Sequence, residues 1–167
     1  RDTVTETGAA LPPARALPIF IQIAEALAYT HNKGIVHRDL KPSNIIILDK
    51  PPGDTKEDEI RILDFGIAKL LPHAGTDGAA LTQTGEVFGS PLYMSPEQCK
   101  GENLDNRSDI YSMGCLMYET LTGKTPINGA NMLEILYRHM NEMPKPMKGQ
   151  VANLSGQLES LVFKTLA

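Results

Sequence analysis

The sequence predicts a mainly α-helical fold that carries one small β-hairpin. Four stretches repeat apolar residues at helical spacing, at residues 14–32, 107–122, 131–143 and 154–166. Two short runs rich in β-branched residues, 45–48 and 60–63, are typical of strands. The chain has 167 residues, of which 41% are apolar and 22% are charged, so it is long enough and apolar enough to fold around its own core.

The first helix is expected over residues 14–32, after a polar segment at 1–13 that ends in two prolines. Pro18 is expected in its first turn or at a bend, and Gly34 is expected to end it in a left-handed conformation. The residues assigned to its apolar stripe are Leu17, Ile21, Ala24, Leu27 and Ala28, widened by Phe20 and Ile23. We therefore divide the chain into a linker, or remnant of an upstream lobe, at 1–13 and a domain at 14–167.

The two predicted strands are separated by a polar loop at 49–58, so they are expected to pair as a hairpin with an extended tip. Residues 69–89 are rich in Gly, Thr and Ala without a sustained period, which predicts a mobile segment. The helix at 107–122 is apolar enough to be buried on most sides, with Gly123 as its cap. Two amphipathic helices follow it.

Composition argues against several classes of partner. The net charge is −4 and no run of Lys or Arg occurs, so nothing favours a nucleic acid or an anionic membrane. No apolar run approaches the ~20 residues that span a bilayer. Cys99 and Cys115 lack close Cys or His neighbours for zinc; we expect reduced thiols in a cytoplasmic protein, with a disulfide as the weaker alternative. The first residues lack an initiator Met and a signal peptide, so we expect a piece of a longer protein, whose anchors could lie elsewhere.

The segment His37-Arg38-Asp39-Leu40-Lys41-Pro42-Ser43-Asn44 carries most of the chemical signal. It places a carboxylate at Asp39, an ammonium at Lys41 and an amide at Asn44, and a second acid follows at Asp64. A base, a cation and two metal-ligand types are what phosphoryl transfer from a magnesium nucleotide requires. Any one of them is an ordinary turn residue, but the four at these offsets favour the chemical interpretation.

Residues 34–97 resemble the catalytic half of eukaryotic-type protein kinases, and the resemblance extends over nearly the whole chain from about Ala14. The segment Tyr93-Met94-Ser95-Pro96-Glu97-Gln98 is most similar to bacterial Ser/Thr kinases. The resemblance implies the large, C-terminal lobe of a protein kinase, with a β-hairpin next to the catalytic loop. It also implies ATP and Mg²⁺ as cofactors and protein Ser or Thr hydroxyls as acceptors.

The resemblance assigns a chemical role to each matched residue. Asp39 would accept the proton of the substrate hydroxyl, and Lys41 would meet the transferring phosphoryl group. Tyrosine-specific members usually lack this lysine, which favours a Ser/Thr acceptor. Asn44 and Asp64 would hold Mg²⁺ through hard oxygen ligands. Two further residues would line the site: Ile46 beneath the adenine, and Ser90, whose hydroxyl would bond the catalytic base and the lysine.

Regulatory and architectural roles are also implied. Arg38 would pair with a phosphate on Thr82 or Thr84, which would order the activation segment; an unmodified, solvated loop is the alternative. His37 and Phe65 would stack in an apolar spine. Glu97 normally pairs with an arginine well downstream, which this chain lacks, so it is expected to be without that partner. Asp109 would accept backbone amides of the catalytic loop, and it also suits the N-terminus of a helix.

The resemblance stops at the small lobe. No glycine-rich loop, strand lysine or partner glutamate for the nucleotide phosphates occurs in the chain, so we expect residues 1–167 alone to be inactive. The main alternative is a pseudokinase-like or truncated module that acts by protein binding; the presence of Asp39, Asn44 and Asp64 argues against it. A kinase of small-molecule hydroxyls is disfavoured by the segment that ends in Ser95-Pro96-Glu97.

Overall fold

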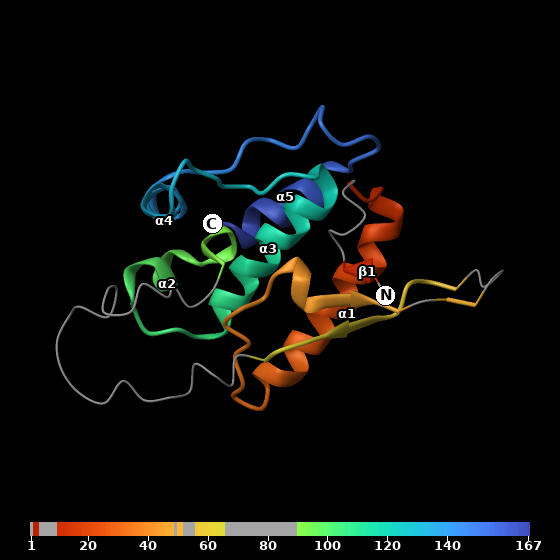
Figure 1. Cartoon of the computed structure of the whole chain (residues 1–167). Helices are drawn as coiled ribbons and strands as arrows, with labels where there is room; N and C mark the ends of the chain where they lie inside the picture. Colours follow the sequence, from red (N-terminus) through yellow and green to blue (C-terminus); the bar gives the residue numbers. More distant parts are fainter. Residues whose placement is uncertain (1, 4–9, 49, 52–55, 66–89) are drawn as a thin grey trace.

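The computed structural model describes residues 2–3, 10–48, 50–51, 56–65 and 90–167, and it has the predicted mainly helical architecture (Figure 1). The helices are α1 (Pro13–His31), α2 (Pro96–Lys100), α3 (Asn106–Thr122), α4 (Met132–Asn141) and α5 (Gly156–Thr165). The strands are β1 (Asp2–Thr3), β2 (Ile45–Ile47) and β3 (Ile60–Ile62), and two 3-10 turns, η1 (Pro42–Asn44) and η3 (Pro91–Tyr93), complete the described elements.

The predicted hairpin is present and lies against α1. Strands β2 and β3 pair antiparallel, with Ile45 opposite Ile62 and Ile47 opposite Ile60. Gln22 of α1 fixes the second strand from the side, because its Nε2 donates to the carbonyl of Asp58 at 2.7 Å and its Oε1 accepts the N–H of Ile60 at 3.2 Å. The hairpin therefore has a fixed position beside the first helix.

Within the segment at 1–13, expected to be a linker or a remnant of an upstream lobe, the structure describes a short strand and a buried leucine. Asp2 and Thr3 form β1, which pairs antiparallel with β2 and makes the sheet three-stranded in the order β1-β2-β3. Leu11 is buried and its N–H donates to the carbonyl of Thr120 at 2.8 Å. Two residues of strand and one buried leucine are too short a signal for hydrophobic periodicity to reveal.

The apolar stripe predicted for α1 was partly wrong: Phe20, Ile23 and Leu27 are buried as predicted, but the other side chains assigned to the stripe are exposed. Leu17 is 44% exposed and Ile21 is 50% exposed. The buried residues of this helix are Ala16, Ile19, Phe20, Ile23 and Leu27. Apolar residues occur around most of its circumference, so the sequence pattern alone cannot tell which side meets the core. Pro13 starts the helix, so Pro18 lies inside it rather than in its first turn.

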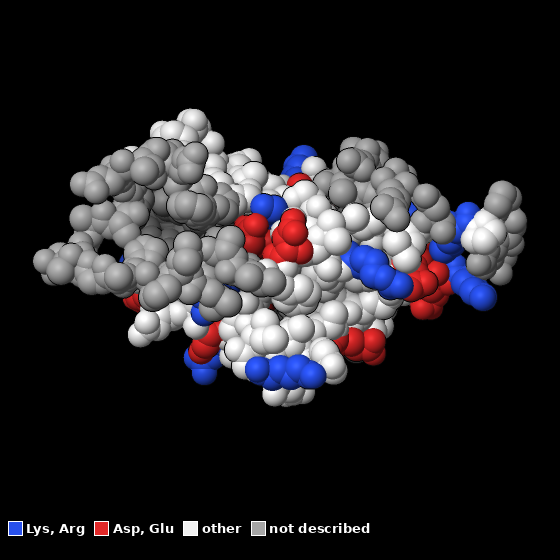
Figure 2. All heavy atoms as spheres, turned by 60° about the horizontal axis from the view of Figure 1, so that its bottom comes forward, with Lys and Arg blue, Asp and Glu red and all other residues white. Residues whose placement is uncertain are grey.

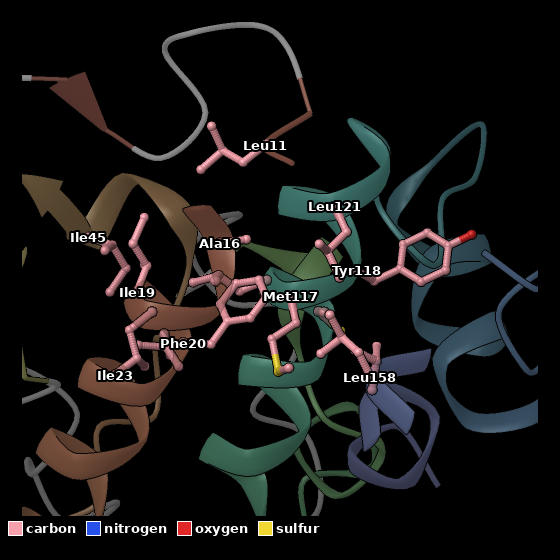
Figure 3. Close-up of a cluster of buried hydrophobic side chains, with 14 of the residues drawn as sticks. Leu11, Ala16, Ile19, Phe20, Ile23, Ile45, Met117, Tyr118, Leu121 and Leu158 are labelled. Carbon is pink, nitrogen blue, oxygen red and sulfur yellow. The ribbon is translucent and has the colours of Figure 1, made fainter. Parts of the chain in front are cut away.

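Helix α3 is the centre of the fold, with α1 on one side and α5 on the other (Figure 1). Most of its length is buried, although Ile110 remains 40% exposed. Figure 3 shows Phe20 of α1 next to Met117 of α3, and Ile19 of α1 next to Ile45 of β2, within one hydrophobic core. Gly123 ends α3 with φ 72°, the left-handed conformation that favours glycine.

Helices α4 and α5 complete the lobe and are each shorter than predicted. Their N-terminal amides are capped by Asn131 and Ser155, whose side chains accept the N–H groups of Glu134 and Leu158. Among the described residues, no helix is long and apolar enough to cross a membrane. On the face seen in Figure 2, the acidic and basic side chains lie in small mixed groups.

Both cysteines are free thiols in the described structure. Burial, helped by the nearby carboxylate of Glu97, raises the pKa of Cys99 to about 11. Burial raises the pKa of Cys115 well above its usual value. Both side chains are therefore protonated at neutral pH, which makes them poor nucleophiles.

Candidate active site

The backbone of the predicted catalytic loop is held by one buried carboxylate. Asp109, in the first turn of α3, is fully buried and accepts the N–H groups of His37 and Arg38 at 2.8 Å each. Its Oδ2 also lies 2.7 Å from Nε2 of His31 at the end of α1. These bonds stabilise a strained turn, since Arg38 has φ 66° in the left-handed region that non-glycine residues seldom adopt.

Three predicted active-site residues lie together on this loop. The Nζ atom of Lys41 lies 2.9 Å from Oδ2 of Asp39, and Nδ2 of Asn44 donates to the backbone carbonyl of Asp39 at 2.8 Å. The side chains of Asp39 and Lys41 are each about a quarter exposed, whereas Asn44 is buried. The loop thus presents a carboxylate and an ammonium to solvent while the buried amide fixes the backbone behind them.

The fourth predicted residue, Asp64, follows a segment that is bonded to the same loop. The N–H of Leu63 donates to the carbonyl of Asn44 at 2.8 Å, and the carbonyl of Leu63 lies 3.0 Å from Nε2 of His37. On the other side of Asp64, the ring of Phe65 lies 4.7 Å from the ring of His37. Asp64 is exposed, and its φ of 51° turns the chain at this point.

The side-chain oxygen atoms of Asn44 and Asp64 suit a hard divalent cation. The amide nitrogen of Asn44 is directed at the carbonyl of Asp39, so its Oδ1 is the atom left to face a metal. Asp64 supplies an exposed carboxylate. Two such oxygen ligands, completed by water and phosphate oxygens, are the usual protein contribution to a Mg²⁺ site.

Strand β2 places Ile46 on the opposite side of the sheet from its neighbours. Ile45 and Ile47 are buried in the core, and Ile46 between them is only partly buried. Side chains alternate along a strand, so an apolar side chain is left at the side away from the core. This position suits the predicted contact with a flat apolar group.

The segment before α2 brings Ser90 to the catalytic loop. Ser90 and Asp39 line the same small cavity, which has room for about one water molecule. Ser112 and Tyr93 line the same cavity. The hydroxyl of Ser112 donates to the carbonyl of Tyr93 at 2.7 Å, and the hydroxyl of Tyr93 bonds the carboxylate of Glu119. Burial, together with that carboxylate, raises the pKa of Tyr93 well above its usual value, so its hydroxyl remains a donor.

Helix α2 connects this segment to the catalytic loop. Glu97 was expected to be without its arginine partner, which stays a prediction; in the structure its Oε1 accepts the hydroxyl of Ser108 at 2.5 Å. Gln98 donates from Nε2 to the carbonyl of Arg38 at 2.9 Å. Gln98 also forms a capping box with Ser95, and the Ser-x-x-Gln spacing is the sequence signal that could have drawn attention to it.

The predicted phosphorylation sites, Thr82 and Thr84, lie outside the residues that the structure describes. The same holds for the whole segment at 69–89, which was predicted to be mobile. Arg38, the predicted partner of such a phosphate, is partly buried in the described catalytic loop. Its regulatory role stays a prediction.

Comparison with known proteins assigns the class. A family model described as "Protein kinase domain" matches residues 2–167, so the chain belongs to the protein kinase family.

Named relatives are bacterial. The chain is 39% identical to "Serine/threonine-protein kinase PknB" of Mycolicibacterium smegmatis over 164 residues, 98% of this chain and 25% of that protein. It is 41% identical to "Probable serine/threonine-protein kinase PknB" of Corynebacterium glutamicum over 155 residues, 93% of this chain and 22% of that protein. The chain thus spans about a quarter of the length of these relatives.

Proposed function

We propose that this chain supplies the catalytic loop of a Ser/Thr protein kinase, which transfers the γ-phosphoryl group of ATP to protein hydroxyls. The observation that carries the proposal is the pairing of Asp39 with Lys41 at 2.9 Å on a loop tied to a buried carboxylate. The kinases named among the relatives, at 39–41% identity, support the same activity.

The mechanism follows from the chemistry of these side chains. Asp39 is the hydrogen-bond acceptor that orients a substrate hydroxyl and takes its proton as the hydroxyl oxygen bonds the γ-phosphorus of ATP and the bond from that phosphorus to the bridging oxygen of the leaving ADP breaks. The ammonium of Lys41 pairs with this carboxylate at 2.9 Å. With substrate bound, the ammonium of Lys41 would interact with negative charge on the transferring phosphoryl group, which would lower the energy of the transition state.

Asn44 and Asp64 are the residues that would hold Mg²⁺. When bound, Mg²⁺ supplies charge neutralisation on the nucleotide phosphates. Ile46 would contact the adenine, and the hydroxyl of Ser90 would bond Asp39 and Lys41. Rigid attachment supports these roles, since Asn44 is buried and bonded to the backbone of the residue that acts as base.

Regulation by phosphorylation extends the proposal. A phosphate on Thr82 or Thr84 would carry a charge of about −2 and bind the guanidinium of Arg38 through charge-assisted hydrogen bonds. Arg38 follows directly on the buried His37 and precedes the catalytic base, so such a pair would act on the base through the backbone.

The substrates and the cellular compartment can be proposed only as classes. We infer that the substrates are proteins with Ser or Thr acceptors and that the chain works in the cytoplasm, where ATP is available. Reduced, free cysteines support this compartment.

The test is the substitution Asp39→Asn in the complete kinase that carries this chain. We expect phosphorylation of a protein substrate, measured with radiolabelled ATP, to fall by at least ~100-fold, the typical contribution of general base catalysis. The matched control is Asp105→Asn, the same chemical change at an exposed helix cap, because Asn also caps helices well. Unchanged transfer by the Asp39 variant, with folding intact, would contradict the proposal.

A further inference from the structure

A buried Tyr–His pair lies between the central helix and the segment that contains Ser90. The hydroxyl of Tyr111 on α3 lies 2.8 Å from Nδ1 of His139 on α4, and the ring centroids are 5.7 Å apart at 65°. Both side chains are buried, at 6% and 3% exposure. No chemical step proposed above uses either residue.

The surroundings of the pair determine which atom carries each proton. Burial raises the pKa of Tyr111 well above its usual value, so the phenol is a donor at neutral pH. Burial lowers the pKa of His139 to about 4, against the opposing effect of the backbone at Pro91 and Leu92, so the imidazole is neutral. A neutral imidazole has one donor and one acceptor nitrogen. If Nδ1 accepts from Tyr111, then Nε2 carries the hydrogen.

The tautomer matters because backbone carbonyls can only accept. Helix α4 packs against η3, and the backbone of Pro91 and Leu92 acts on the imidazole of His139, for which Nε2 is the nitrogen that Tyr111 leaves available. Among the described residues, Nε2 is buried and makes no hydrogen bond, so it can act on the turn only through the electrostatic attraction between its N–H and nearby carbonyl oxygens. With the opposite tautomer, a nitrogen lone pair would face carbonyl oxygens and repel the turn.

The same turn is held from α3 at two other points. Ser112, next to Tyr111 in sequence, donates to the carbonyl of Tyr93, and Glu119 bonds the hydroxyl of Tyr93. The pair of Tyr111 and His139 acts on the same turn at two other residues, Pro91 and Leu92. Ser90 immediately precedes the turn and lines the cavity beside Asp39.

We propose that Tyr111 and His139 are positioning residues that hold the segment at 90–94 in place for the protein substrate, with the Tyr111 hydroxyl selecting the imidazole tautomer that attracts this segment. The proposal rests on the kinase function proposed above. It predicts an effect on substrate binding that ordinary core packing does not, because Tyr111→Phe keeps the ring volume and removes only the hydroxyl.

The first experiment requires no enzymatic activity. Hydrogen exchange of the chain is measured by mass spectrometry for wild type, Tyr111→Phe and His139→Gln. In both variants we expect the amides of Ser90 and of residues 92–94 to lose about tenfold in protection while those of α1 stay unchanged. Tyr29→Phe, the same change at a tyrosine that is 64% exposed, is the control. Unchanged exchange at 90–94 in Tyr111→Phe would overturn the proposal.

The second experiment measures steady-state kinetics of the complete kinase with a peptide substrate. Tyr111→Phe should raise the KM for peptide about fivefold, as expected for one lost hydrogen bond, and leave kcat and the KM for ATP unchanged. The double variant with His139→Gln should raise it no further than the larger single effect, because both act through one contact. Parallel changes in both KM values, or a lower melting temperature alone, would indicate that the pair contributes only to packing of the core. Either result would overturn the proposal.

The two experiments separate failure of this inference from failure of the proposed function. A wild-type kinase that phosphorylates no protein would refute the proposed function and with it the claim about substrates. The exchange measurement would still decide whether the pair holds the turn.

Discussion

The buried carboxylate of Asp109 offers the sharpest test of how the catalytic loop is held. Replacing it with alanine removes the acceptor for two backbone N–H groups, those of His37 and Arg38, at a site that water does not reach. Each buried donor left without an acceptor costs ~1–3 kcal/mol. The lost contact with His31 adds ~1 kcal/mol. We therefore expect Asp109→Ala to lower the free energy of unfolding by roughly 4 kcal/mol.

This change is large enough to measure by urea unfolding followed by circular dichroism at pH 7.5. Asp109→Asn should cost about half as much, because the amide keeps one acceptor oxygen but turns a donor toward the other N–H. Asp105→Asn, four residues earlier, serves as the exposed control and should cost less than about 0.5 kcal/mol. If Asp109→Ala lies within about 1 kcal/mol of wild type, the carboxylate does not hold the loop.

Two further predictions concern the packing of the lobe. Because the folded pKa of His139 is about 4 and its ordinary value is 6.5, the unfolded chain gains a proton first as the pH falls. Stability should therefore drop by roughly 2 kcal/mol between pH 7.5 and pH 5, a loss that His139→Gln removes in urea titrations at both pH values; an equal drop in the variant would refute the assignment. Gly114→Ala would place a Cβ against the side chains of Thr165 and Leu166 in the contact between α3 and α5. We expect a loss of ~1–3 kcal/mol in the same assay, and a fully stable variant would show that this contact yields easily.

The catalytic loop was the part of the protein most readable from sequence. The chemistry of Asp39, Lys41 and Asn44 depends on side-chain type at fixed offsets within one short segment, and that information is present in the sequence itself. The hairpin was equally accessible, because both of its strands are β-branched runs separated by a single loop.

The sequence could not predict which face of α1 is buried, and the reason is physical. Leu17 and Ile21 lie on one side of the helix, and Ile19 and Ile23 lie on another, so two apolar stripes compete. The choice between them is made by α3 and the sheet, which pack against the second stripe. Periodicity reports which residues share a face, and only tertiary packing reports which face is covered.

The bonds that join separate segments were the least predictable features and are also those that fix the site. Asp109 reaches more than seventy residues back to His37, and Gln98 reaches sixty residues back to the carbonyl of Arg38. The left-handed turn at Arg38 is intrinsically unfavourable, so its persistence requires partners on both its N–H and its carbonyl. Those partners come from two different helices. Movement of either α2 or α3 would therefore release one side of the turn and shift Asp39, which makes the geometry of the base a property of the lobe rather than of the loop alone.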